Sequence, residues 1–227
     1  MKSQTFKFAF QKTIPIMAGF IFLGATYGIY MHQSGFNFLY PTLMAATIFG
    51  GSVEFVIANL LLGKFNPWLV FFLTFIINSR HLFYAISMLS KYRGTGRKQI
   101  FMVFGMCDET FAINYSTKVP SNIDHKEFMF YVTLLDYAYW VSGAFLGGVL
   151  GGLITIKLPG LDFVMTALFL VLFANQFINE KSHFSTITGL LLTFITLFVV
   201  GTQWFLLVSL ILMVIILRIR YHREVAK

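Results

Sequence analysis

Apolar runs of about twenty residues recur along this chain, and they decide which solvent it folds in. The runs cover residues 14–31, 38–62, 67–89, 100–117, 128–156, 161–178, 184–200 and 202–218. Most are apolar on nearly every face, so lipid rather than water must surround them. Hydrophobic residues make up 57% of the chain and charged residues 11%, which excludes an ordinary soluble domain. We predict an all-α polytopic integral membrane protein with about six to eight membrane helical segments.

The positive charge indicates membrane topology rather than a nucleic-acid partner. The formal net charge is +8, but the basic residues lie in short clusters beside apolar segments. These clusters are Lys2, Lys7 and Lys12; Lys91, Arg93, Arg97 and Lys98; and Arg218, Arg220, Arg223 and Lys227. Cytoplasmic flanks carry such clusters, so both termini are expected in the cytoplasm. The connections are too short for another domain, so residues 1–227 are predicted to form a single transmembrane domain. The single Cys107 excludes an internal disulfide.

The order of the basic loops indicates that one early segment does not cross. If every segment crossed, loop 91–98 would lie opposite the basic N-terminus, against the positive-inside tendency. Segment 38–62 is interrupted by Gly50-Gly51-Ser52, and such a break could make two half-helices that enter and leave on one face. The alternative is that one short loop disobeys the charge rule.

A weak internal similarity favours the first interpretation. A shift of about 122 residues lays segment 14–31 on 136–153 and Glu54-Phe55 on Gln176-Phe177. We therefore predict inverted repeats of opposite orientation at 14–89 and 136–211, linked by segment 100–117, with 38–62 and 161–178 both re-entrant. The alternative is a coincidence between apolar sequences.

An arginine stands inside an apolar segment, in the stretch "NSRHLFYAIS". A charge at the bilayer centre costs about 3 kcal/mol or more, and a guanidinium cannot lose its proton. Arg80 should therefore face water, an internal carboxylate or a substrate carboxylate. On a helix Tyr84 shares its side, while Asn78 shares the face of His81. The plainer alternatives are an Arg80 that only holds the bundle together and a His81 that only packs.

Four carboxylates lie in the same apolar segments, namely Glu54, Asp108, Glu109 and Asp136. Against Arg80 alone they would leave a net charge of −3 in the membrane. We expect at least one to carry a proton, which makes Asp108, Glu109, His81 and Asp136 candidates for proton coupling. Adjacent residues point to different faces, so only one of Asp108 and Glu109 should share a cavity with Arg80. Alternatively, Glu109 or Asp136 caps a helix or lies near the interface.

The glycines of "GAFLGGVLGG" predict close helix packing. Gly143, Gly147, Gly148, Gly151 and Gly152 place small residues at four-residue spacing. Enzymatic motifs do not occur: there is no H-E-x-x-H helix, no Cys/His metal spacing, no G-x-S-x-G elbow and no phosphate-binding Gly-Lys motif. We expect no cofactor and no metal, and we disfavour an intramembrane hydrolase.

The blocks "GGSVEF", "NSRHLFYAIS", "CDETFA", "YWVSGAFLGGVLGG" and "GLDFVMTALFLVL" resemble, in this order, the signature blocks of the AzlC family. The resemblance covers nearly the whole chain. It implies a bacterial cell-membrane protein that exports leucine, isoleucine, valine and often methionine, with a small AzlD-like membrane subunit. Members of the family commonly carry Gln where this chain has Glu54. That difference adds an ionisable group beside the glycine break.

An exported amino acid is a zwitterion, and the buried groups can be assigned to its parts. Arg80 and the helix start at Gly51 and Ser52 suit the carboxylate, with Asn78 and Tyr84 beside them. Glu54 or Asp108 suits the ammonium group. The predicted mechanism is alternating access with proton exchange at Asp108 or Glu109. The alternatives are a channel or uniporter for small polar solutes and a membrane subunit that does not itself transport.

Overall fold

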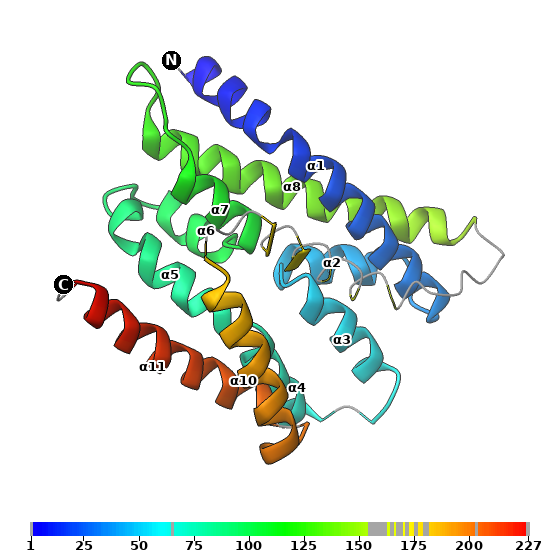
Figure 1. Cartoon of the computed structure of the whole chain (residues 1–227). Helices are drawn as coiled ribbons and strands as arrows, with labels where there is room; N and C mark the ends of the chain where they lie inside the picture. The colour runs from blue at the N-terminus through cyan, green and yellow to red at the C-terminus, as the bar shows by residue number, and fades with distance from the viewer. Residues whose placement is uncertain are drawn as a thin grey trace. The chain divides into compact units, whose positions relative to one another are not determined.

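The computed structural model describes residues 2–64, 66–153, 182–202 and 204–225, with residues 163, 166, 170, 173, 174, 177 and 178 between them. These residues form two compact units, residues 1–164 and 165–227, which we describe separately. Every regular element in the described residues is a helix (Figure 1). The all-α class predicted from the apolar runs is confirmed for this part of the chain.

The first unit contains eight of the described helices. They are α1 (Lys2–Gln33), α2 (Leu39–Thr47), α3 (Ser52–Leu61), α4 (Pro67–Ile77), α5 (Ser79–Tyr92), α6 (Lys98–Phe104), α7 (Asp108–Ser116) and α8 (His125–Gly151). By length and hydropathy, one described helix, α1, could cross a membrane alone. Pro67–Phe75 and Ser79–Tyr92 could cross as a pair, bent by 50°. The predicted six to eight segments are therefore not confirmed as a count of crossings.

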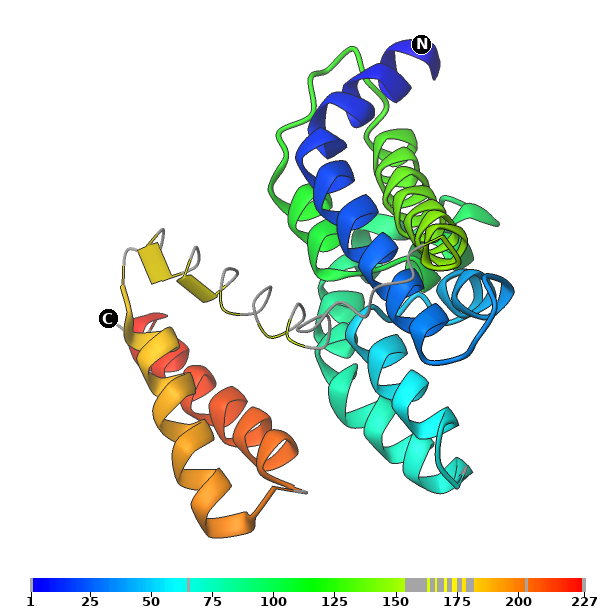
Figure 2. The same ribbon diagram turned by 90° about the vertical axis from the view of Figure 1, so that its right-hand side faces the viewer.

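Helices α1 and α8 lie side by side and run in the same direction (Figures 1 and 2). Near their beginnings the rings of Phe8 and Phe128 are 5.4 Å apart. Near their ends a Cβ atom built on Gly147 would lie 2.0 Å from the carbonyl oxygen of Ala25. Only glycine allows backbones to approach so closely, so the packing role predicted for the glycines of α8 is confirmed.

This parallel course corrects one expectation. Inverted repeats would give segments 14–31 and 136–153 opposite orientations, but the helices that contain them run together. The two segments that the 122-residue shift aligned do lie in neighbouring helices, α1 and α8. Their sequences are similar because both helices carry small residues on the face where they pack together. Most of segment 161–178 lies outside the described residues, so its re-entrance stays a prediction.

Helix α2 runs from the far end of α8 to its middle. Gly148 of α8 packs against Phe38, just before α2, and the Tyr137 hydroxyl donates a 2.9 Å hydrogen bond to the carbonyl of Ala46 near the end of α2. With nine residues, α2 is about 14 Å long, half of a hydrocarbon core of about 30 Å. The helix therefore stops halfway along its neighbour.

Helix α3 then returns toward the end from which α2 came. The ring of Phe55, near its start, lies 5.1 Å from that of Tyr27 on α1. One turn further on, the Tyr30 hydroxyl donates a 2.7 Å hydrogen bond to Oδ1 of Asn59. Both contacts advance toward the C-terminal end of α1. The predicted break at Gly50-Gly51-Ser52 is confirmed, and the α2–α3 pair has the course of a re-entrant hairpin.

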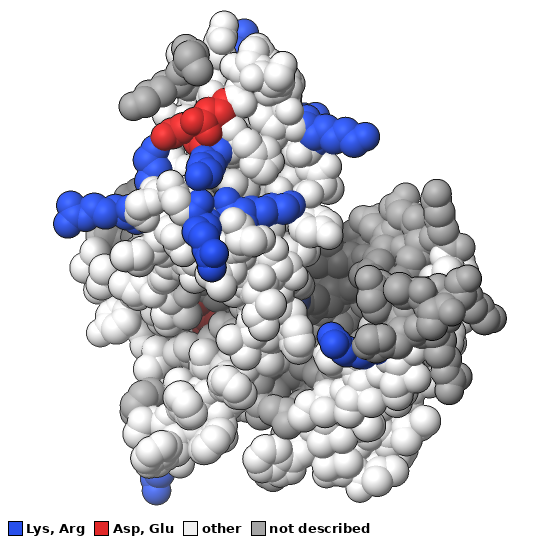
Figure 3. All heavy atoms as spheres, turned by 90° about the vertical axis from the view of Figure 1, so that its left-hand side faces the viewer, with Lys and Arg blue, Asp and Glu red and all other residues white. Residues whose placement is uncertain are grey.

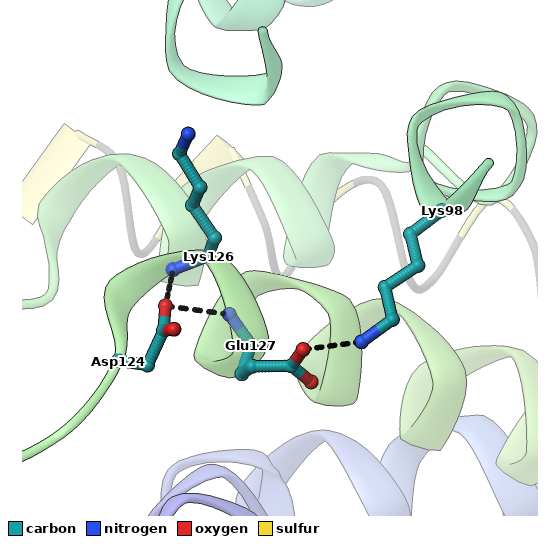
Figure 4. A network of polar contacts seen from close by, with 4 residues as sticks. All are labelled: Lys98, Asp124, Lys126 and Glu127. Atoms are coloured by element: carbon teal, nitrogen blue, oxygen red, sulfur yellow. Dashed lines mark hydrogen bonds and ion pairs between the residues drawn. The ribbon is translucent and has the colours of Figure 1, made fainter. Parts of the chain in front are cut away.

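Helices α6 and α7 form a second hairpin of this kind, from the opposite end of the unit. Lys98, at the start of α6, forms an ion pair with Glu127 in the first turn of α8, where Asp124 caps the helix by accepting N–H bonds from Lys126 and Glu127 (Figure 4). Gly105, just after α6, packs against Thr133 further along α8.

Helix α7 goes back toward the beginning of α8. Thr110 in its first turn bonds Asp136, whereas Asn114 in its last turn donates a 3.1 Å hydrogen bond to the Tyr92 hydroxyl at the end of α5. On the sequence alone, we treated 100–117 as one apolar segment without a break. Gly105, Met106 and Cys107 interrupt it.

Helices α4 and α5 pass from one end of the unit to the other. They meet at Asn78, so segment 67–89 is also broken, which the sequence analysis did not predict. After α5, Gly94 lies beside the Lys126 ammonium at the start of α8. Loop 91–98 therefore shares an end with the N-terminus of α1, as the charge pattern predicted. Lys and Arg side chains gather on the face that shows this end (Figure 3).

The second unit contains α10 (Phe184–Val200) and α11 (Phe205–Val225), an antiparallel hairpin (Figures 1 and 2). Gly189 packs against the Met213 side chain, and the guanidinium of Arg220 lies 4.1 Å from the centre of the Phe184 ring. These helices match the predicted segments 184–200 and 202–218.

Candidate functional site

Three helices of the first unit begin close together, halfway along α8. Each follows a break: α3 begins at Ser52, α5 at Ser79 and α7 at Asp108. Two contacts join them. A Cβ atom built on Gly50 would lie 3.5 Å from Nδ2 of the Asn78 side chain. Arg80 forms an ion pair with Asp108. Helix beginnings carry partial positive charge and unbonded N–H groups, so this region favours negatively charged groups.

The tips of the two hairpins meet in the same region. Phe49, at the tip of α2–α3, lies 6.3 Å from Phe104 at the tip of α6–α7, measured between ring centres. Both rings pack against Tyr137 of α8, at 5.3 Å and 6.2 Å. Aromatic side chains therefore fill the space between the two tips at this depth.

Arg80 is paired with a carboxylate across this region. Its Nη1 lies 2.8 Å from Oδ2 of Asp108, and the two side chains are 33% and 26% exposed, so the pair remains reachable. Tyr84, one turn further along α5, stacks on Phe111 of α7 at 4.6 Å. Arg80 and Tyr84 thus share the face toward α7, as predicted. His81 is half-buried with its ring edge against Tyr84.

Glu54 is wholly buried, and its side chain fixes the backbone at the break between α2 and α3. Its Oε1 accepts hydrogen bonds from the backbone N–H groups of Gly50 and Gly51, at 2.9 and 3.3 Å, and from the indole N–H of Trp140 at 3.1 Å. Gly51 has a φ of +52°, a conformation that suits glycine. Glu54 therefore faces the interior, while the neighbouring Ser52 hydroxyl is buried without a hydrogen-bond partner among the described residues.

Asp136 is the second wholly buried carboxyl group. The Thr110 hydroxyl, in the first turn of α7, donates a 2.7 Å hydrogen bond to its Oδ2. Its Oδ1 has no hydrogen-bond partner among the described residues. Glu109, beside Asp108, is half-buried. Asp136 thus links α8 to the beginning of α7, close to the Arg80–Asp108 pair.

A groove of about 340 Å³ opens at the bend between α4 and α5. Its lining residues are Phe71, Thr74, Phe75, Asn78, Ser79 and Leu82. Sequence reasoning missed this feature, although these residues recur three and four apart, the spacing of one helical stripe. The groove is apolar along α4, and its polar end lies next to Arg80.

Among the residues that the structure describes, no group of three His, Cys, Asp or Glu side chains is placed to hold a metal ion. The charged groups of the site instead face one another, the backbone or uncharged polar side chains. The site is therefore described by its ion pair, its helix beginnings and its groove.

Comparison with known proteins decides the family. Residues 15–154, which span α1 to α8 except for the beginning of α1, match the family described as AzlC protein. The Branched-chain amino acid transport protein AzlC of Bacillus subtilis is 54% identical over 206 residues, covering 91% of this chain and 81% of that protein. The chain belongs to the AzlC family. The resemblance noted from the sequence blocks is thereby confirmed, and the region shared with the AzlC family contains all three breaks.

Two further relatives are more distant. An uncharacterized membrane protein of Haemophilus influenzae is 44% identical over 215 residues, covering 94% of this chain and 88% of the relative. The inner membrane protein YgaZ of Escherichia coli is 26% identical over 188 residues, covering 79% and 76%. No solved structure matches this AzlC-family chain.

Proposed function

We propose that this protein exports branched-chain amino acids, namely leucine, isoleucine and valine, with methionine as a further substrate, across the bacterial cell membrane. The observation that carries the substrate class is the 54% identity to a protein named for branched-chain amino acid transport. The geometry that supports a transporter is an accessible ion pair where two half-length hairpins meet. Transport is proton-coupled and proceeds by alternating access, together with a small AzlD-like subunit.

The Arg80–Asp108 pair suits a zwitterion. The substrate carboxylate takes the place of Asp108 beside Arg80, and the ammonium group takes the place of Arg80 beside Asp108. This exchange adds no net charge to the site. The first N–H groups of α3, with the Ser52 hydroxyl, add donors for the carboxylate. Because Glu54 is already bonded to the backbone and Trp140, Asp108 is the better acceptor for the ammonium group.

The coupling proton is assigned to the carboxyl groups beside this pair. Of the candidates Asp108, Glu109, His81 and Asp136, the geometry favours Asp136, because it is wholly buried and one of its oxygens has no hydrogen-bond partner among the described residues. Within the described part of the chain, its hydrogen bond comes from Thr110 on α7. A movement of α7 upon substrate binding would change what Asp136 contacts, which would couple the two events.

The basic end of the first unit lies in the cytoplasm in this proposal. The beginnings of α1 and α8 and loop 91–98 share that end, and their Lys and Arg residues follow the positive-inside tendency. The N-terminus is then cytoplasmic, and we propose the same side for the C-terminus because its Lys and Arg residues follow the same tendency. Substrate enters from this side and leaves at the ends of α1 and α8.

Excretion of amino acids from dipeptide-loaded cells tests the proposal. Cells expressing this chain, with and without its candidate small subunit, are loaded with leucine-, valine- and methionine-containing dipeptides. Excretion of the free amino acids should exceed that of empty cells and should continue when the external concentration of the amino acid is higher than the internal one. Excretion that only follows the gradient would indicate a channel, and no excess with the complex verified in the membrane would overturn the proposal. If excess appears only when the small subunit is present, the subunit is required.

Substitution of Arg80 tests the site. Arg80→Ala should abolish excretion, because it removes the cation for the substrate carboxylate. However, it also leaves Asp108 without its ion pair, which can destabilise the protein. The double variant Arg80→Gln with Asp108→Asn keeps the site neutral and should also lose export while inserting normally. Arg93→Ala, at an exposed residue of the basic loop, is the matched control and should transport normally. Full export by a well-inserted double variant would remove the pair from the site.

A further inference from the structure

We infer that the groove between α4 and α5 receives the aliphatic side chain of the transported amino acid and so sets the selectivity of the transporter. The inference rests on the proposed function and assigns a part of its site to residues of α4. The groove lies at the bend of the helix pair, with its polar end at Asn78 and Ser79, directly before Arg80. A ligand held at Arg80 therefore has its remaining atoms within reach of this groove.

The polarity of the groove matches that of a branched-chain amino acid. Phe71, Phe75 and Leu82 supply apolar walls, and these side chains are 58%, 49% and 53% exposed. Their apolar surface is therefore open to a ligand. At the other end Asn78 supplies an amide, where the charged head of the amino acid would lie. The volume of about 340 Å³ is at the small end of the range for small-molecule sites.

The amide of Asn78 distinguishes this groove from a surface that only contacts lipid. Its Oδ1 is buried and has no hydrogen-bond partner among the described residues. A lipid chain offers no donor, so contact with lipid would leave this oxygen unsatisfied at a cost in free energy. The ammonium group of an amino acid has three donors, one of which would satisfy this oxygen. The substrate thus supplies the hydrogen-bond donor that Asn78 Oδ1 lacks among the described residues.

Selective enlargement of the groove tests the inference. Cells are loaded with alanyl-leucine and alanyl-phenylalanine, and the initial excretion rates of leucine and phenylalanine are compared. Phe75→Ala should raise the ratio of phenylalanine to leucine about 10-fold, because a hydrophobic pocket discriminates by size to about this extent. Phe72→Ala is the matched control: Phe72 lies on the same helix with 51% exposure, against 49% for Phe75, and does not line the groove. It should leave the ratio unchanged.

A second variant, which makes the groove smaller, keeps the inference testable if the first variant does not fold. Thr74→Phe fills the groove and should lower leucine excretion about 10-fold more than valine excretion in cells loaded with alanyl-leucine and alanyl-valine. Unchanged ratios in both variants, with normal wild-type export and normal membrane abundance, would overturn the inference and leave the proposed function standing. Absence of export by the wild type would instead remove the proposed function itself. Equal ratio changes in the Phe72→Ala control would also count against the groove.

Discussion

Two of the carboxyl groups near the site have different surroundings. Asp108 faces Arg80 and is partly exposed, so a ligand can reach it. Glu54 is wholly buried and accepts bonds from Gly50, Gly51 and Trp140. The sequence predicted that these carboxyl groups would lie in the membrane and that one of Asp108 and Glu109 would face Arg80. It could not separate ligand-binding from structural roles, because that depends on which backbone N–H groups lie nearby.

Glu54→Ala tests the structural role at the first break. It leaves three donors in or near the interior without their acceptor, and a buried donor without an acceptor costs about 1–3 kcal/mol. We expect a clear loss of thermal stability in detergent. The measurement is thermal unfolding monitored by the fluorescence of the protein. Glu54→Gln keeps an acceptor oxygen at the same place and should lose much less stability. Equal losses for the two variants would contradict this role.

The elements of the first unit are of two kinds, long helices and broken pairs. The break in 38–62 was predictable because Gly50 and Gly51 interrupt an apolar run. The break at Asn78 was not, because no glycine or proline marks it. Gly105 was a signal for the third break, but a single glycine is tolerated in a helix. The parallel contact of α1 and α8 depends on tertiary packing, which periodicity alone does not specify.

A glycine comparison tests how much the long helices depend on close approach. Gly147→Ala places a methyl group where the Ala25 carbonyl oxygen would lie 2.0 Å away, so α1 and α8 must separate. We expect a loss of about 1–3 kcal/mol or more in the free energy of unfolding. At Gly19 of α1 a Cβ atom would meet nothing within 4 Å, so Gly19→Ala should leave stability unchanged or slightly raised. Thermal unfolding of both variants in one detergent decides the comparison.

At the scale of the whole first unit, hairpins enter from both ends and meet at Phe49 and Phe104. This arrangement predicts which connections lie on the same side of the membrane. Loop 91–98 and the connection between α7 and α8 lie at one end of the unit, and the connection between α3 and α4 lies at the other. A continuous crossing at 100–117 would instead put the two former connections on opposite faces.

Cysteine labelling separates these topologies. In a Cys107→Ala background, single cysteines are introduced by Lys64→Cys, Arg93→Cys and Ser121→Cys, all at exposed residues. A membrane-impermeant maleimide should label the Lys64→Cys variant in intact cells. It should label the Arg93→Cys and Ser121→Cys variants only after permeabilisation. Labelling of Ser121→Cys but not Arg93→Cys in intact cells would indicate that segment 100–117 crosses the membrane continuously and does not form a hairpin.

The meeting of the two hairpin tips also has an electrical consequence. If water reaches the tips from either side, the membrane potential falls across a thin layer around Phe49 and Phe104 rather than across the full bilayer. One elementary charge that passes this layer would then gain or lose about 2.3 kcal/mol per 100 mV. A zwitterion carries no net charge, so it would contribute nothing. The voltage dependence of transport would therefore count the protons that move with each amino acid.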